Sequence, residues 1–169
     1  LGALINGERS YIDVSTEVRQ FSARIVGPSL DLLGTSIELL KLEGLIEVVD
    51  NCGGDGEELL RLTPNGFLEL KEYLKSTIRS GSSDLNKLVV ALKLRFIEVL
   101  APSERLDQLV GLQTMYQAER NRLQDLRKHK EWSAGMLQEL LDLELDVTDQ
   151  RLLWCCEQVK KIKKVINSS

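Results

Sequence analysis

The sequence has little of what metal centres and disulfide-bonded folds require. Its 169 residues include three cysteines and one histidine. An odd number of cysteines does not suit a disulfide framework, and a single histidine leaves zinc without its usual ligands. Cys52, Cys155 and Cys156 are therefore expected to be free thiols, and neither a metal nor a cofactor is expected.

Catalytic motifs are also missing. The sequence has no nucleophile elbow, and its glycine-rich stretch at 52–56 lacks the lysine of a phosphate-binding loop. One histidine, His129, offers little scope for general base catalysis. The sequence therefore predicts that the protein is not an enzyme.

No apolar run approaches the roughly 20 residues that a membrane-spanning helix needs. The opening residues 1–7, LGALING, are too short for a signal peptide and lack its basic residues. They also lack an initiator methionine, so the true N-terminus is expected a few residues upstream. These features favour a cytoplasmic protein.

The first half of the sequence predicts helices and one β-hairpin, from apolar spacing and turn residues. Ser15 or Thr16 is expected to cap the second helix and Gly44 to end the third. Residues 10–14 fit either a short strand or a helix start. The expected helices cover residues 1–7 (the end of a first helix), 15–25, 28–43 and 63–78, and the expected strands cover residues 45–49 and 58–63.

Beyond a linker-like stretch at 79–84, RSGSSD, the sequence predicts only helices. Ser103 is expected to cap the helix that follows Pro102. Apolar residues then recur at coiled-coil spacing towards the C-terminus, with Thr148 interrupting the seam. We expect a mostly α-helical protein with two domains, at 1–80 and 81–169.

Two short stretches carry a family resemblance. LEGLIEV at 42–48 joins the third helix to the hairpin, and RLTPNG at 61–66 joins the hairpin to the next helix. With the long helical tail, they resemble the PadR family of bacterial transcriptional regulators. The resemblance implies an N-terminal winged helix-turn-helix domain, with 28–43 as recognition helix and the hairpin as wing, and a C-terminal helical dimerisation domain.

The sequence departs from that family in the charge of its wing and in one core position of its recognition helix. Gly34 stands where the family's recognition helix has an aromatic residue, and Glu57 and Glu58 stand where its wing usually has bases. Residues 1–80 hold eight basic and thirteen acidic residues, a balance of −5, whereas residues 81–169 carry +1. Because carboxylates repel phosphates, this wing is expected to weaken DNA binding.

The residues expected to contact DNA are polar or charged side chains on the recognition helix, the preceding helix and the wing strand. An ordinary solvated surface with ion pairs would have the same composition. The candidates are Arg19, Arg24, Ser29, Thr35, Ser36, Glu38, Lys41 and Arg61. Leu32, Leu39 and Leu42 lie off the buried stripe of the recognition helix, so they either pack on a neighbouring helix or form a protein-binding patch.

The C-terminal helices are expected to form a homodimer through apolar residues. The expected seam consists of Leu106, Leu109, Leu141, Leu145, Leu152 and Val159. The resemblance also implies a pocket for a small aromatic effector between these helices and the winged-helix domain, although aromatic residues in a bundle serve equally as core. The candidates for that pocket are Phe96, Tyr116, Trp132 and Trp154.

Together these features predict a homodimeric, DNA-binding transcriptional regulator that acts as a repressor and responds to an effector. The acidic wing and Gly34 leave an alternative open: a winged-helix module that has lost DNA binding and binds a protein partner.

Overall fold

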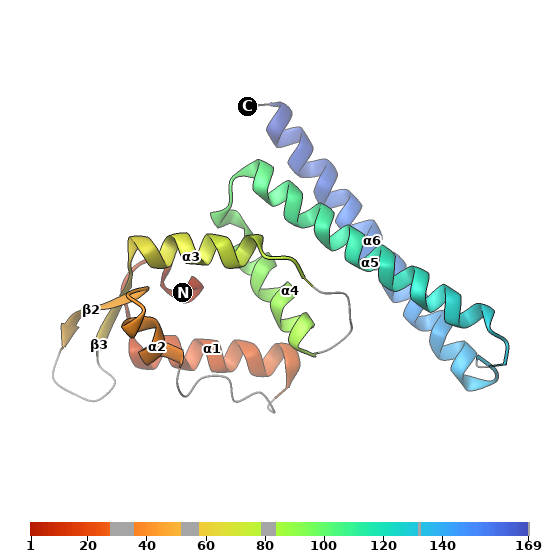
Figure 1. Cartoon of the computed structure of the whole chain (residues 1–169), viewed down its shortest axis with the longest axis horizontal. Helices are drawn as coiled ribbons and strands as arrows, with labels where there is room; N and C mark the ends of the chain where they lie inside the picture. Colours follow the sequence, from red (N-terminus) through yellow and green to blue (C-terminus); the bar gives the residue numbers. More distant parts are fainter. Residues whose placement is uncertain (28–35, 52–57, 79–83, 132, 169) are drawn as a thin grey trace. The chain divides into compact units, whose positions relative to one another are not determined.

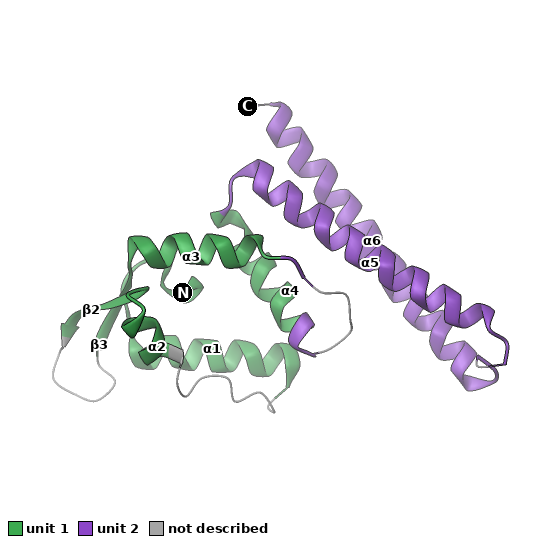
Figure 2. Ribbon diagram, in the orientation of Figure 1, with its two compact units in different colours: residues 1–76, 87–99 green, residues 77–86, 100–169 purple. Residues whose placement is uncertain are grey.

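The computed structural model describes residues 1–27, 36–51, 58–78, 84–131 and 133–168 (Figure 1). The chain divides into two compact units, which are described separately (Figure 2). Unit 1 consists of Leu1–Ser76 and Lys87–Val99, and unit 2 of Thr77–Asn86 and Leu100–Ser169. The domain boundary expected at residue 80 stays a prediction.

Unit 1 combines helices with a small sheet, and unit 2 is helical, which confirms the predicted mostly α fold class. The helices of unit 1 are α1 (Tyr11–Val26), α2 (Ser36–Leu42), α3 (Pro64–Lys75), most of α4 (Asp84–Phe96), and the short 3-10 helices η1 (Gly2–Leu4) and η2 (Ile97–Val99). The strands are β1 (Arg9–Ser10), β2 (Ile46–Asn51) and β3 (Glu58–Leu62). They form an antiparallel sheet in the order β1-β3-β2.

The core of unit 1 lies where η1, α1 and α2 meet the sheet. Leu4, Val14, Ile37, Ile46 and Leu60 form one buried cluster, and Leu60 on the central strand is fully buried. Burial of such aliphatic side chains contributes roughly 1.5–3 kcal/mol each. The wing is therefore anchored by the same cluster that holds α2.

The start of α1 corrects one prediction. Ser10, not Ser15 or Thr16, is the N-cap, and its hydroxyl accepts a hydrogen bond from the Asp13 amide at 3.1 Å. Ser10 ends β1 in extended conformation, so the helix begins at the next residue. Residues 10–14 thus contain both a strand end and a helix start, and β1 adds a third strand that the expected hairpin lacked.

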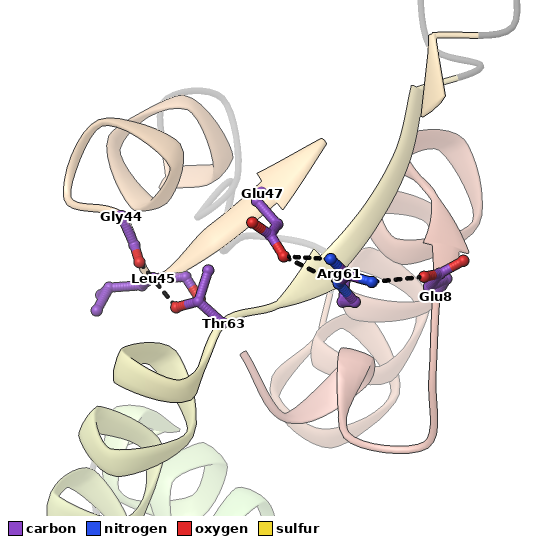
Figure 3. Close-up of polar contacts among 6 residues, drawn as sticks. All are labelled: Glu8, Gly44, Leu45, Glu47, Arg61 and Thr63. Atoms are coloured by element: carbon purple, nitrogen blue, oxygen red, sulfur yellow. Dashed lines mark hydrogen bonds and ion pairs between the residues drawn. The ribbon is translucent and has the colours of Figure 1, made fainter. Parts of the chain in front are cut away.

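Thr63 connects the two junction motifs on which the family resemblance depends (Figure 3). Its hydroxyl lies 2.8 Å from the Gly44 carbonyl oxygen and 3.1 Å from that of Leu45, and can donate to either. The same oxygen accepts from the Gly66 amide at 3.0 Å, which caps α3. The end of α2 and the start of α3 are therefore joined where the wing begins and ends.

Unit 2 is built mainly from two long helices that pack on each other, α5 (Pro102–Lys128) and α6 (Met136–Asn167) (Figure 1). The expected cap Ser103 is wrong, because the helix starts with Pro102 after Ala101 as N-cap. Pro102 has no amide proton to satisfy, and the Glu104 carboxylate accepts from the Ala101 amide at 2.9 Å.

Thr148 lies within the apolar seam of α6 without an unsatisfied polar group. Its side chain is almost fully buried, and its hydroxyl donates to the Glu144 carbonyl oxygen at 2.8 Å. Such bonding within the helix lets a threonine occupy a buried position. Among the described helices, none combines the length and hydrophobicity needed to span a membrane.

Candidate nucleic-acid interface

The candidate interface comprises α2 and the wing strands β2 and β3. Ile37 is buried on the inner side of α2, so the helix has a fixed orientation on the core. Glu38, Leu39 and Leu42 are exposed on α2, with Leu42 84% exposed. Leu42 is therefore not packed on a neighbouring helix among the described residues, whereas for Leu39, which is 52% exposed, such packing stays a prediction.

Within the described residues of α2, Lys41 is the one basic residue. Its ammonium group lies between two carboxylates. Its ammonium is 2.9 Å from Glu38 on the same helix and forms a second ion pair with Glu58 on β3. The Tyr11 ring centroid is 5.8 Å away, and the Lys41 side chain is only 19% exposed. Burial alone would lower the pKa of Lys41, but the hydrogen bonds to Glu58 and Glu38 raise it above its ordinary value.

Arg61 on β3 is also held by two carboxylates (Figure 3). Its Nε and Nη2 donate to Glu47 Oε1 at 2.9 and 2.7 Å, and its Nη1 donates to Glu8 at 3.3 Å. The hydrogen bonds with Glu47 raise the pKa of Arg61. The guanidinium group thus presents its donors to protein carboxylates from β2 and from the residue before β1.

These contacts give the described interface an acidic character. Lys41 and Arg61 are surrounded by four glutamates, Glu8, Glu38, Glu47 and Glu58. Ion pairs at a protein surface contribute little to stability, because water and salt screen them. The larger effect of these ion pairs is on DNA binding. A phosphate that approaches Lys41 or Arg61 meets a cation that is already paired with a carboxylate.

Arg19 and Arg24 lie exposed on α1. Arg24 donates to the carbonyl and side-chain oxygens of Gln20, both at 3.3 Å. Neither arginine forms an ion pair with a residue in the described part of the chain. They are therefore cations that could meet phosphate without displacing a carboxylate.

Several predicted site residues lie outside the described residues or cannot be placed in full. Ser29, Thr35 and Glu57 are not described, and neither are Gly34, Leu32, Cys52 and Trp132. Ser36 is the first residue of α2. Their predicted roles stay predictions.

The residues expected in the dimer seam already pack within one chain. Leu109, Leu141 and Val159 are buried in unit 2, and Leu106, Leu145 and Leu152 are half-buried. Packing of α5 on α6 covers them without a second chain. Their role in dimerisation stays a prediction.

The residues expected around an effector fall in different units. Phe96 lines an apolar cavity of about 500 Å³ in unit 1. In unit 2, Tyr116 lies on α5 with its ring 5.7 Å from the Arg151 guanidinium, and Trp154 is partly exposed on α6. A shared effector site for these residues stays a prediction.

Comparison with protein families identifies one match over almost the whole chain. The family model of AphA-like transcriptional regulators matches residues 1–159. None of the curated proteins compared matches the chain.

Solved structures of PadR-type regulators are similar to this chain at low sequence identity. Bacillus subtilis PadR in complex with p-coumaric acid is 19% identical, with 96% of this chain and 95% of that chain covered and a TM-score of 0.40. The PadR-like regulator of Bacillus cereus is 13% identical, with 96% and 94% covered and a TM-score of 0.42. Bacillus subtilis PadR in complex with operator DNA is 21% identical, with 95% of each chain covered and a TM-score of 0.38. The resemblance to a family of transcriptional regulators, expected from the junction motifs, is confirmed by the family match over residues 1–159.

Proposed function

The chain belongs to the AphA-like family of transcriptional regulators, and from this premise we propose that it binds double-stranded DNA as a homodimer. The family is one of regulators and not of enzymes, in agreement with the sequence. The observation that carries the proposal is a family match that includes the whole winged-helix unit and most of α6.

DNA contact would come from the recognition helix, α1 and the wing. Arg19 and Arg24 on α1 support this proposal, since they form no ion pair within the described residues. Ser29, Thr35, Ser36 and Glu38 are proposed to contact base edges or backbone, and Lys41 and Arg61 the phosphates. Because chromosomal DNA is the target, the cytoplasm is the proposed location.

An exposed stripe on α6 supports the homodimer. Met136, Leu140, Leu143 and Trp154 share one helix face by their spacing, and all four are exposed in the single chain. This stripe differs from the predicted seam, whose residues are covered by the packing of α5 on α6. Two copies could bury it against each other and so place two recognition helices on one operator.

Repression and effector binding complete the proposal. A dimer that occupies an operator would block transcription, so a reporter gene under that operator should be silenced. The apolar cavity beside Phe96 is of the size that small ligands occupy, roughly 300–1,000 Å³. An aromatic molecule bound there would be expected to release the DNA.

The test is a fluorescence anisotropy titration with the duplex upstream of the protein's own gene, from about 50 to 200 mM salt. Binding should be measurable at the lowest salt and weaken as salt rises, since phosphate contacts release counterions. The absence of binding at about 50 mM salt would reject the proposal.

A protein-binding module that no longer reads DNA is the second candidate function. The exposure of Leu39 and Leu42, 52% and 84%, favours it, because apolar side chains on a recognition helix suit a protein partner better than a groove. Glu58→Lys separates the two candidates: it should strengthen DNA binding markedly for a regulator and leave a protein-binding module without DNA affinity.

A further inference from the structure

We infer that Glu47 and Glu58 are positioning residues that limit the affinity of this protein for DNA of any sequence. They hold Arg61 and Lys41 in ion pairs that a phosphate must displace. The inference rests on the proposed DNA binding, and it concerns how strongly the interface binds rather than whether it does.

Glu58 determines where the Lys41 ammonium lies. A lysine on an isolated helix would pair only with Glu38, three residues before it, and could swing its long side chain into solvent. In the folded unit, Glu58 on β3 draws the ammonium towards the sheet, beside the Tyr11 ring, and leaves the side chain largely covered. Removal of the Glu58 charge would leave the ammonium paired only with the more exposed Glu38 among the described residues, and so make it more available to phosphate.

Glu47 acts on Arg61 through geometry as well as charge. One carboxylate oxygen of Glu47 receives both Nε–H and Nη2–H, and Glu8 receives Nη1–H (Figure 3). A phosphate binds arginine through the same planar set of donors. Carboxylate and phosphate therefore compete for one set of donors.

The competition predicts a specific salt dependence. A free cation that contacts phosphate contributes about 0.9 to the slope of log K against log salt, because one counterion leaves the DNA. A cation that is already paired with a carboxylate contributes less to this slope, because its contact with phosphate releases fewer counterions in net. Freed cations should therefore raise both the affinity and the slope.

The experiment uses the full chain and a fluorescein-labelled 20-bp duplex of arbitrary sequence. Affinities of the wild type, Glu47→Gln, Glu58→Gln and the double variant are measured from about 50 to 200 mM salt. Glu72→Gln is the matched control, since it also removes one charge from an ion pair, 2.5 Å from Lys75 on α3, outside α2 and the wing. Circular dichroism checks that every variant is folded.

We expect Glu58→Gln and Glu47→Gln each to tighten binding, by up to about tenfold at about 50 mM salt, and to raise the slope by less than about 0.9, because Glu38 still pairs with Lys41 and Glu8 with Arg61. Glu72→Gln should change affinity by less than about twofold, because net charge alone acts weakly through screening. Glu58→Asp, which keeps the charge, should restore affinity close to the wild type.

Two results would overturn the inference, and they are distinguishable. If the wild type binds the duplex and the two variants behave like Glu72→Gln, the ion pairs do not limit binding and the proposed function stands. If no folded protein in the set binds the duplex, the proposed DNA binding fails as well. Binding by the variants alone would support the inference.

Discussion

The hydroxyl of Thr63 lies 2.8 Å from the carbonyl oxygen of Gly44, although 19 residues separate them. Gly44 follows α2 with a positive φ of 68°, and Thr63 precedes α3. The Thr63 side chain therefore contacts the backbone at both ends of the wing. The geometry of the candidate interface depends on this contact, since it fixes the end of α2 against the last strand.

Thr63→Ala should destabilise unit 1. The substitution removes the cap of α3 and the bond to the Gly44 or Leu45 carbonyl, and loss of a cap costs about 1–2 kcal/mol. Thr63→Ser keeps the hydroxyl and should stay within about 0.5 kcal/mol of the wild type. Urea denaturation measures both, and equal stability of the two variants would contradict the role assigned to the hydroxyl.

Gly66→Ala should destabilise unit 1 more strongly. A Cβ atom at this position would lie 1.9 Å from the Leu45 carbonyl oxygen, so the backbone would have to move, at a cost of about 2 kcal/mol or more. Gly111→Ala is the control, because on α5 a Cβ would meet nothing within 4 Å and should stabilise the helix by roughly 0.5–1 kcal/mol. Thermal unfolding should show shifts of opposite sign.

Glu17 should make the stability of unit 1 depend on pH. The hydrogen bond from Arg9, with a further contribution from Arg95, lowers the pKa of Glu17 despite its partial burial. A carboxylate whose folded pKa is lowered stabilises the fold above its unfolded pKa, near 4.3, and that contribution disappears as pH falls through the folded value.

Glu17→Gln should therefore cost about 1 kcal/mol at neutral pH and less at about pH 3. Urea denaturation at the two pH values measures the difference. A cost that is the same at both would show that the ion pairs with Arg9 and Arg95 do not stabilise unit 1.

The two adjacent cysteines should react with thiol reagents at different rates. Cys155 is fully buried between α5 and α6, and this burial, with a smaller effect of Cys156, raises the pKa of Cys155 to about 11. Only the thiolate reacts, so Cys155 should be modified slowly in native protein at about pH 8 and rapidly in urea. Cys156 is less buried, and its sulfur accepts from Gln113 at 3.2 Å.

The measurement compares two double variants: Cys52→Ser with Cys156→Ser, which leaves only Cys155, and Cys52→Ser with Cys155→Ser, which leaves only Cys156. Cys156 should react faster, and equal native rates would contradict the burial of Cys155.

Leu143→Asp should dissociate the proposed homodimer. Leu143 is exposed on the α6 stripe, where a carboxylate would be desolvated against a second copy at a cost of several kcal/mol. Leu68→Asp on α3 is the control, since it makes the same change at a residue of similar exposure in unit 1. Light scattering should give a dimer for the wild type and the control and a monomer for Leu143→Asp, and a monomeric wild type would refute the dimer.

Much of the fold follows from local sequence signals. Apolar spacing and turn residues predicted α1, α3, the wing and the long C-terminal helices, because period and chain reversal depend on neighbouring residues. The helix caps were harder to predict. Ser10 caps α1 because β1 pairs with β3 up to that residue, with Ser10 opposite Leu59, and such a pairing between distant segments is invisible to a local pattern.

The sequence by itself determined the composition of the candidate interface: a winged-helix unit with few bases and many glutamates. Only the tertiary structure decided which glutamate meets which cation. Lys41 meets Glu58 across 17 residues and Arg61 meets Glu8 across 53, because the fold brings β3 next to β1 and within reach of α2. Strand order and register bring such charges together, and neither depends on distance along the chain.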